Sequence, residues 1–89
     1  MAIGELARAA GFSKTQFVRL FKNTFSCTPY TYIMRTRLQQ AKQQVLGSSQ
    51  TLAVIAGNTG FSSQSHMTTA FARAFQATPG DMRRVARSR

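Results

Sequence analysis

Apolar residues along this chain recur every three or four positions, and no stretch shows the sustained alternation of a half-buried strand. This spacing predicts helices throughout, so we expect an all-α fold. The clearest stripe lies within the segment 13–25 and comprises Phe17, Leu20, Phe21, Thr24 and Phe25. A stripe at these positions shares one helix face, and we expect its phenylalanines to be buried.

Helix starts are marked by recognisable caps. Ser13 and Gln16 have the spacing of a capping box, in which each side chain accepts a hydrogen bond from the other residue's backbone. Thr28-Pro29 predicts the start of a second, longer helix that Gly47 ends. That helix has roughly 18 residues and a length of about 27 Å.

The second half of the chain repeats the first. Gly11-Phe12-Ser13 recurs as Gly60-Phe61-Ser62, and Thr28-Pro29 recurs as Thr78-Pro79. The offset is 49 residues at the glycine and 50 residues at the Thr-Pro pair, so the second copy has one extra residue at its turn. Matching apolar positions are Phe17 and Met67, Phe21 and Phe71, and Phe25 and Phe75.

Each copy has the plan of a helix-turn-helix: a short helix, a turn containing glycine and a second helix. The sharp turn requires a backbone position with positive φ, which glycine adopts readily. We expect the aromatic residue that follows, Phe12 or Phe61, to fill the angle between the helices. An ordinary αα-corner explains one copy equally well, whereas two copies on a strongly basic chain favour DNA binding.

Charge points to a polyanionic partner. Twelve Lys or Arg residues face two acidic residues in 89 residues, which gives a net charge of +10. Nucleic acid is the commonest partner of so basic a small domain, and an anionic membrane surface is the rival. With 43% hydrophobic residues the chain has enough apolar side chains to fold around a small core.

Other classes of function lack the residues they need. One cysteine and one histidine provide neither an intrachain disulfide nor a zinc site, and two acids provide no catalytic pair. We therefore expect no enzyme, metal or cofactor. The longest apolar run near the middle, Leu52 to Ala56, is too short for a membrane span, and no export signal is evident. These features predict a cytoplasmic protein.

The residues resemble the DNA-binding domain of AraC/XylS-type bacterial transcription regulators. The resemblance runs from Ile3 to about Arg84. It is carried by Leu6-Ala7 with Gly11-Phe12-Ser13, Arg19 with Phe21, Thr28-Pro29 with Tyr32-Ile33, Arg37-Leu38 with Ala41, Ile55-Ala56 with Gly60-Phe61-Ser62, Gln64-Ser65-His66, Phe71, Phe75, and Thr78-Pro79 followed by Met82-Arg83.

The resemblance implies two helix-turn-helix subdomains, residues 1–27 and 48–89, joined by a linker helix over residues 28–47. It also implies that both recognition helices enter successive major-groove segments on one face of duplex DNA. Geometry agrees, because these segments repeat about every 34 Å. A linker helix of about 27 Å plus the width of the flanking subdomains matches that repeat.

In the first recognition helix, the face opposite the stripe presents the candidate DNA contacts. We expect base contacts from Thr15, Val18 and Arg19, which also match the family's reading positions. An arginine can bond bidentately to guanine, and a valine can pack on a thymine methyl group. Lys14 and Lys22 are expected to contact phosphate.

In the second recognition helix, we expect an inward face of Met67, Ala70, Phe71, Ala74 and Phe75. Base contacts are expected from Ser65, Thr68 and Thr69, and phosphate contacts from Gln64, His66 and Arg73. Arg37 of the linker helix is a further candidate phosphate contact, although pairing with Glu5 or with helix ends explains it equally well. The tail arginines Arg83, Arg84, Arg87 and Arg89 are expected to attract phosphate without specificity or simply to be solvated.

The second copy departs from the family, since the position of Thr69 is often basic in relatives and no charge occurs from Gln43 to Ala72. We infer that the first subdomain anchors affinity and that the second reads weakly or through DNA shape. The alternatives are a nonspecific nucleoid-type or RNA-binding module and an amphipathic membrane-surface protein. Capped helices and phenylalanine stripes disfavour the latter.

The resemblance further implies RNA polymerase as a partner, a nucleoid-associated location, and a separate N-terminal effector or dimerisation domain. Family members usually carry another helix before the region of Ile3. We therefore expect the chain as given to have lowered thermal stability. A melting temperature that stays the same when upstream residues are restored would contradict this expectation.

Overall fold

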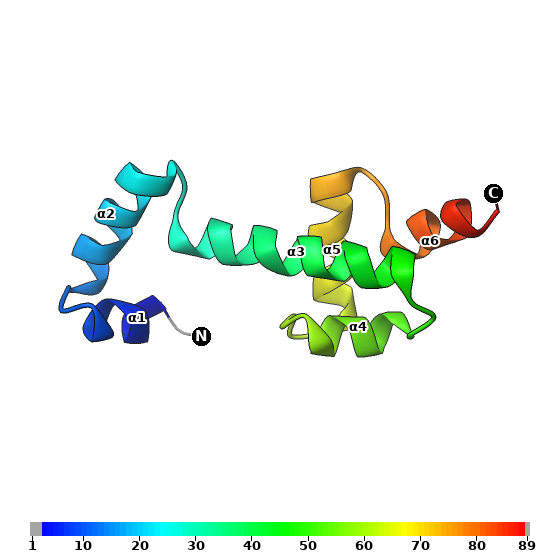
Figure 1. Cartoon of the computed structure of the whole chain (residues 1–89), viewed down its shortest axis with the longest axis horizontal. Helices are drawn as coiled ribbons and strands as arrows, with labels where there is room; N and C mark the ends of the chain where they lie inside the picture. The colour runs from blue at the N-terminus through cyan, green and yellow to red at the C-terminus, as the bar shows by residue number, and fades with distance from the viewer. Residues whose placement is uncertain (1–2, 89) are drawn as a thin grey trace. The chain divides into compact units, whose positions relative to one another are not determined.

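The computed structural model describes residues 3–88, and every regular element within that range is a helix. Their bounds are α1 Ile3–Ala9, α2 Lys14–Phe25, α3 Pro29–Gly47, α4 Leu52–Asn58, α5 Gln64–Phe75 and α6 Pro79–Arg87 (Figure 1). The all-α fold class is confirmed for the described part of the chain.

The internal repeat is visible in how α2 and α5 begin and end. Each helix has 12 residues, and its N-cap serine, Ser13 or Ser63, accepts a hydrogen bond from the backbone of the third helical residue. Each ends at a residue in the left-handed region, Ser26 at φ 63° and Gln76 at φ 56°. These caps satisfy backbone groups that would otherwise lack partners, so the same local chemistry sets both helices.

Glycines shape both turns as expected. Gly11 has φ 80° and Gly60 has φ 87°, a region that side chains with a Cβ rarely adopt. The aromatic residues after them behave differently. Phe61 is buried and fills its corner, whereas Phe12 is 40% exposed, so the expected filling holds only for the second copy.

The chain divides into two compact units, residues 1–35 and 36–89. The first contains α1, α2 and the first turns of α3. The second contains the remainder of α3 together with α4, α5 and α6. Each unit is described below in its own right.

The second unit has a well-formed core. Three helices supply most of its buried apolar side chains: Leu38, Ala41 and Val45 from α3, Ile55 and Ala56 from α4, and Met67 and Phe71 from α5. At the edge of the core the ammonium group of Lys42 lies 5.0 Å from the ring centroid of Phe75. In this unit the predicted inward face of α5 is largely confirmed, except that Ala74 is exposed to solvent.

The first unit buries much less. Ala7 and Pro29 are buried, but α2 contains no buried residue, and Phe25 is 52% exposed. The predicted burial of the phenylalanine stripe was therefore wrong. The stripe exists as an aromatic cluster on one face: the rings of Phe21 and Phe25 lie 4.4 Å apart, and Tyr32 lies 5.6 Å from Phe21. Within this unit α1 and the first turns of α3 provide too little apolar surface to bury that cluster.

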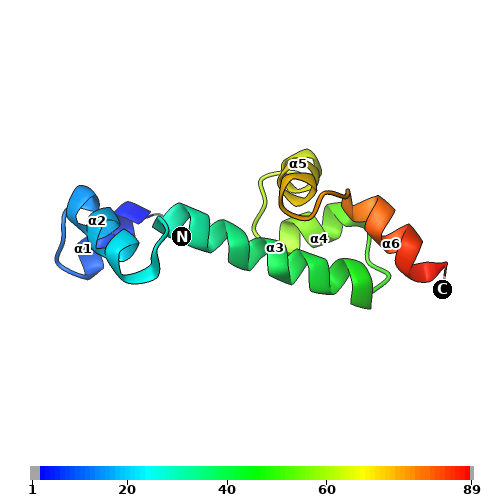
Figure 2. The ribbon, with the colours of Figure 1, turned by 90° about the horizontal axis from the view of Figure 1, so that it is seen from above.

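Arg83 ties α6 to the end of α3. Its guanidinium donates hydrogen bonds to four backbone carbonyls, those of Val45 at 3.0 Å, Gln50 at 2.6 Å, Ser48 at 3.2 Å and Gln44 at 3.4 Å. Figure 1 shows α6 beginning at the level of the last turn of α3 and running past it, and Figure 2 shows that the two helices are offset in depth. For Arg83 the expectation of a tail arginine that attracts phosphate or is solvated was wrong, because its donors are occupied by backbone carbonyls at the end of α3 and in the loop that follows.

Candidate nucleic-acid interface

The first candidate recognition helix is α2, and its N-terminal end is fixed by the predicted capping box. The backbone of Gln16 donates to Ser13 Oγ at 3.2 Å, and the backbone of Ser13 donates to Gln16 Oε1 at 3.1 Å. The expectation that Gln16 is a cap is thus confirmed. Of the five predicted contact residues on this helix, Val18 is half-buried and the others are exposed: Lys14, Thr15, Arg19 and Lys22.

The second candidate recognition helix is α5. Four of its predicted contact residues are exposed, namely Gln64, Ser65, Thr69 and Arg73, while His66 and Thr68 are half-buried. Met67 and Phe71 on the opposite face are fully buried and hold α5 against the core of its unit. Thr68 of α5 and Val18 of α2 occupy matching positions in the repeat and are both half-buried.

The N-caps pair Ser13 with Ser63 and not, as the sequence repeat suggested, with Ser62, so the extra residue of the second copy is Ser62. Because Ser13 and Ser63 are the two N-caps, the insertion lies just before the cap. Ser62 Oγ lies 3.0 Å from His66 Nδ1 in a hydrogen bond, and the imidazole packs edge-on against Phe61 at a centroid distance of 5.3 Å. His66 therefore stands where Gln16 stands in the first copy, and helix packing explains its position.

Arg37 lies against the turn between α4 and α5. A Cβ built on Gly60 would lie 2.8 Å from Arg37 Nε and 3.3 Å from its Cζ. The guanidinium thus covers the one residue of this turn that has no side chain. The structure brings Arg37 close to the start of α5, the second candidate recognition helix, whereas sequence alone placed it only on the linker.

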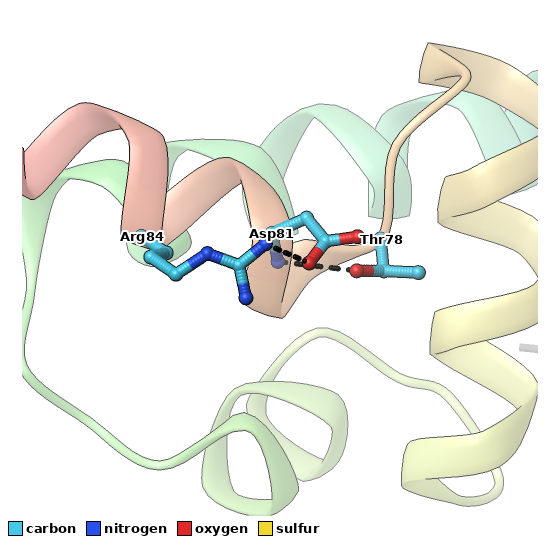
Figure 3. Close-up of polar contacts among 3 residues, drawn as sticks. All are labelled: Thr78, Asp81 and Arg84. Atoms are coloured by element: carbon cyan, nitrogen blue, oxygen red, sulfur yellow. Dashed lines mark hydrogen bonds and ion pairs between the residues drawn. The ribbon is translucent and has the colours of Figure 1, made fainter.

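All four Lys and Arg side chains of the two candidate recognition helices are accessible to an anionic partner. Lys14, Arg19, Lys22 and Arg73 are exposed, and no acidic residue lies in α2 or α5. Asp81 instead belongs to α6, where its backbone N–H donates to Thr78 Oγ1 at 3.1 Å and its carboxylate pairs with Arg84 at 2.7 Å (Figure 3). This confirms Asp81 as the N-terminal acid of its helix.

Sequence reasoning missed the role of Arg83 because its partners lie 33 to 39 residues earlier in the chain. No local pattern distinguishes it from Arg84, its neighbour. Among residues 3–88 there is no cluster of three His, Cys, Asp or Glu side chains that could hold a metal ion. No helix in that range combines the length and apolar character needed to cross a bilayer.

Known proteins share both the sequence pattern and the fold. A family described as a helix-turn-helix domain matches residues 6–85. The chain is 37% identical over 79 residues to "Probable transcriptional regulator LumQ" of Photobacterium leiognathi, and the match covers 89% of this chain and 32% of that protein.

Two solved structures extend the comparison. An AraC-type transcriptional regulator from Chromobacterium violaceum superposes with a TM-score of 0.84 at 29% identity and covers 97% of this chain and 77% of that one. The DNA-binding domain of AdpA, solved in complex with a target DNA, superposes with a TM-score of 0.93 at 25% identity and covers 99% and 79%.

The match accounts for nearly all of this chain but for less than a third of LumQ. It includes both glycine turns and both capped helices that the structure shows. The chain therefore belongs to the AraC-type helix-turn-helix family of transcription regulators.

Proposed function

We propose that this chain is the DNA-binding part of a bacterial transcription regulator and that it reads duplex DNA in a sequence-specific manner. The observation that supports this proposal most strongly is a repeated structural unit. Each copy has a positive-φ glycine turn, a serine cap and a 12-residue helix with exposed polar residues in its first half. In this proposal α2 and α5 enter successive major-groove segments on one face of the DNA.

On α2, Arg19 and Thr15 read base edges, and Val18 packs on a thymine methyl group. The exposure of Arg19 and Thr15 supports the first assignment, and the half-buried state of Val18 fits an apolar contact at the edge of the helix. Lys14 and Lys22 flank these residues and meet phosphates, which supply most of the nonspecific affinity.

On α5, Ser65, Thr68 and Thr69 are the base-reading residues, and Gln64, His66 and Arg73 contact the backbone. Ser62 supports the assignment of His66, because its hydrogen bond to Nδ1 orients the imidazole and leaves Nε2 as the ring nitrogen that can face a phosphate oxygen. Arg37 completes the phosphate contacts from its place over the turn before α5.

In the proposed organisation, residues 1–27 and 48–89 are reading modules and residues 28–47 connect them. The whole regulator acts in the cytoplasm on the nucleoid, without enzymatic activity, and contacts RNA polymerase. A separate effector or dimerisation domain accompanies it, consistent with the greater length of LumQ. The alternative is a nonspecific nucleoid-type module held by the charge of +10 alone.

Selection of bound duplexes from a fully randomised pool at moderate salt separates these two functions. We expect enrichment of one site with two boxes about one helical turn apart, with the first box more sharply defined than the second. Tight binding with no enriched sequence would replace the proposal with the nonspecific module. Loss of binding to excess random competitor would point the same way.

A further inference from the structure

An apolar hollow of about 490 Å³ lies between the last turn of α3 and α6, within the second unit. Six residues line it: Leu46, Ala77, Asp81, Met82, Val85 and Ala86. None of them is assigned to DNA above. The hollow is thus a feature that the proposed DNA contacts do not use.

Its walls carry large apolar side chains that face solvent. Leu46 on α3 is 47% exposed and Val85 on α6 is 58% exposed. Leaving such side chains in water forgoes the stabilisation that their burial would supply. Single exposed apolar residues are ordinary, but two that line one concave surface mark a place for another molecule.

The hollow is held in shape before anything binds. Arg83 joins its two walls, since α6 carries this side chain and its hydrogen bonds end on Val45 and Gln44 of α3. Thr78 caps the same helix by accepting from the backbone of Asp81 at 3.1 Å (Figure 3). Because α6 is already ordered, a partner that binds in this hollow pays little of the entropic cost of ordering that helix.

The surroundings are positively charged. Asp81 lines the hollow, but Arg84 pairs with it at 2.7 Å, and α6 carries Arg83 and Arg87 in addition. A second concave surface on α6, of about 440 Å³, is lined largely by these arginines. An apolar groove beside cationic side chains complements an apolar stripe flanked by carboxylates.

Charge also argues against two other occupants. A second copy of this chain would bring the same cationic helix to the interface, and like charges in juxtaposition oppose association. Nucleic acid could contact the arginines, but its polar phosphate and sugar groups do not match the apolar lining of the hollow. We propose that this groove docks an amphipathic helix of an acidic protein partner, with apolar anchors at i, i+3 or i+4, and i+7.

The probe is a 16-residue helical peptide with leucines at those spacings and glutamates on both flanks. Its affinity for the 89-residue protein is measured by fluorescence anisotropy, and its site by methyl and amide chemical shifts. Two control peptides are a scrambled sequence of equal charge and a version with lysines in place of the glutamates. We expect binding of the first peptide at least about 10-fold tighter than either control.

Matched variants locate the site. Val85→Ser should weaken peptide binding about 5-fold by removing buried apolar area. Arg84→Gln should weaken it about 2-fold to 5-fold, as for an exposed ion pair. Val54→Ser is the control, because Val54 is also a half-exposed valine, at 46%, but lies on α4 outside the groove. It should leave the affinity unchanged.

Several results would overturn the proposal. Equal affinity for the scrambled peptide, or chemical-shift changes confined to Arg19 and Arg73, would mean that the peptide binds through charge alone and not in the groove. Shifts of Leu46 and Val85 on addition of duplex DNA without peptide would assign the face to DNA. A dimer in sedimentation that Val85→Ser dissolves would assign it to a second copy. Selection of DNA with the Val85→Ser variant tests the proposed function separately, because Val85 is not one of the proposed DNA contacts and its loss should leave the selected site unchanged.

Discussion

Arg19 and Thr69 occupy matching positions in the two copies, 50 residues apart, and both are exposed. An arginine can make two hydrogen bonds to guanine, whereas a threonine hydroxyl makes weaker and less selective contacts. The two proposed recognition helices thus carry chemically different side chains at the same structural position. We therefore expect the two residues to contribute unequally to the affinity for DNA.

Arg19→Ala is expected to cost roughly 1 to 3 kcal/mol of specific DNA binding, and Thr69→Ala much less. The measurement is a titration of each variant against the selected duplex and against random duplex at the same salt concentration. Equal losses from the two substitutions would refute the view that the first copy is the anchor.

Gly11 and Gly60 form a second matched pair. Both have positive φ, but a Cβ at Gly60 would press on Arg37, whereas a Cβ at Gly11 would meet nothing within 4 Å. Gly11→Ala should destabilise its unit by about 1 to 2 kcal/mol through backbone strain alone. Gly60→Ala should cost about 1 kcal/mol more, because the guanidinium must move.

Urea unfolding followed by NMR signals of each unit measures both effects. In an Arg37→Ala background the additional cost at Gly60 should vanish, since the crowded partner is gone. An unchanged cost in that background would show that the contact contributes nothing beyond strain.

One long-range side chain, Arg83, connects α6 to α3 and to the loop after it. Arg83 and Arg84 are adjacent in sequence, but Arg83 bonds to backbone carbonyls of α3 and the following loop, and Arg84 bonds to an exposed carboxylate within its own helix. A half-buried arginine that donates to the last carbonyls of a neighbouring helix contributes more to the free energy of unfolding than an exposed ion pair does.

Arg83→Gln is expected to destabilise the second unit by about 2 kcal/mol, because several carbonyls lose a charged donor. Arg84→Gln serves as the matched control and should cost about 0 to 1 kcal/mol. Thermal unfolding monitored by circular dichroism compares the two. Similar melting temperatures for both variants would mean that solvent replaces the donors of Arg83 at no cost.

Taken as a whole, the molecule has one well-filled unit and one sparsely filled unit. Phe71 and Ile55 are fully buried in residues 36–89, while α2 in residues 1–35 buries no side chain completely. Since apolar burial is the main stabilising term, local unfolding should differ between the units.

Native-state hydrogen exchange tests this difference. Amides in α5 should be protected at least about 10-fold more strongly than amides in α2, although the two helices have equal length and similar caps. A duplex that carries the selected site should raise protection in α2 most. Uniform protection across both helices would mean that the chain unfolds as one cooperative unit.

Local chemistry made much of the fold predictable from sequence. The caps at Ser13 and Thr28 and the positive-φ glycines all depend on interactions within about four residues. The repeat then placed candidate DNA contacts on both helices, and these contacts remain predictions. Burial was less predictable, because the same periodicity in α2 and α5 meets different neighbours.

Helices, turns and the repeated plan therefore follow from residues that are close in sequence. The buried face of α5, the exposed aromatic cluster of α2 and the contacts of Arg37 and Arg83 do not. The two arginines contact partners 23 to 39 residues away, and the two helix faces depend on which neighbouring helices pack against them in three dimensions. A periodic pattern records which face of a helix is apolar, but the surrounding helices determine whether that face is covered.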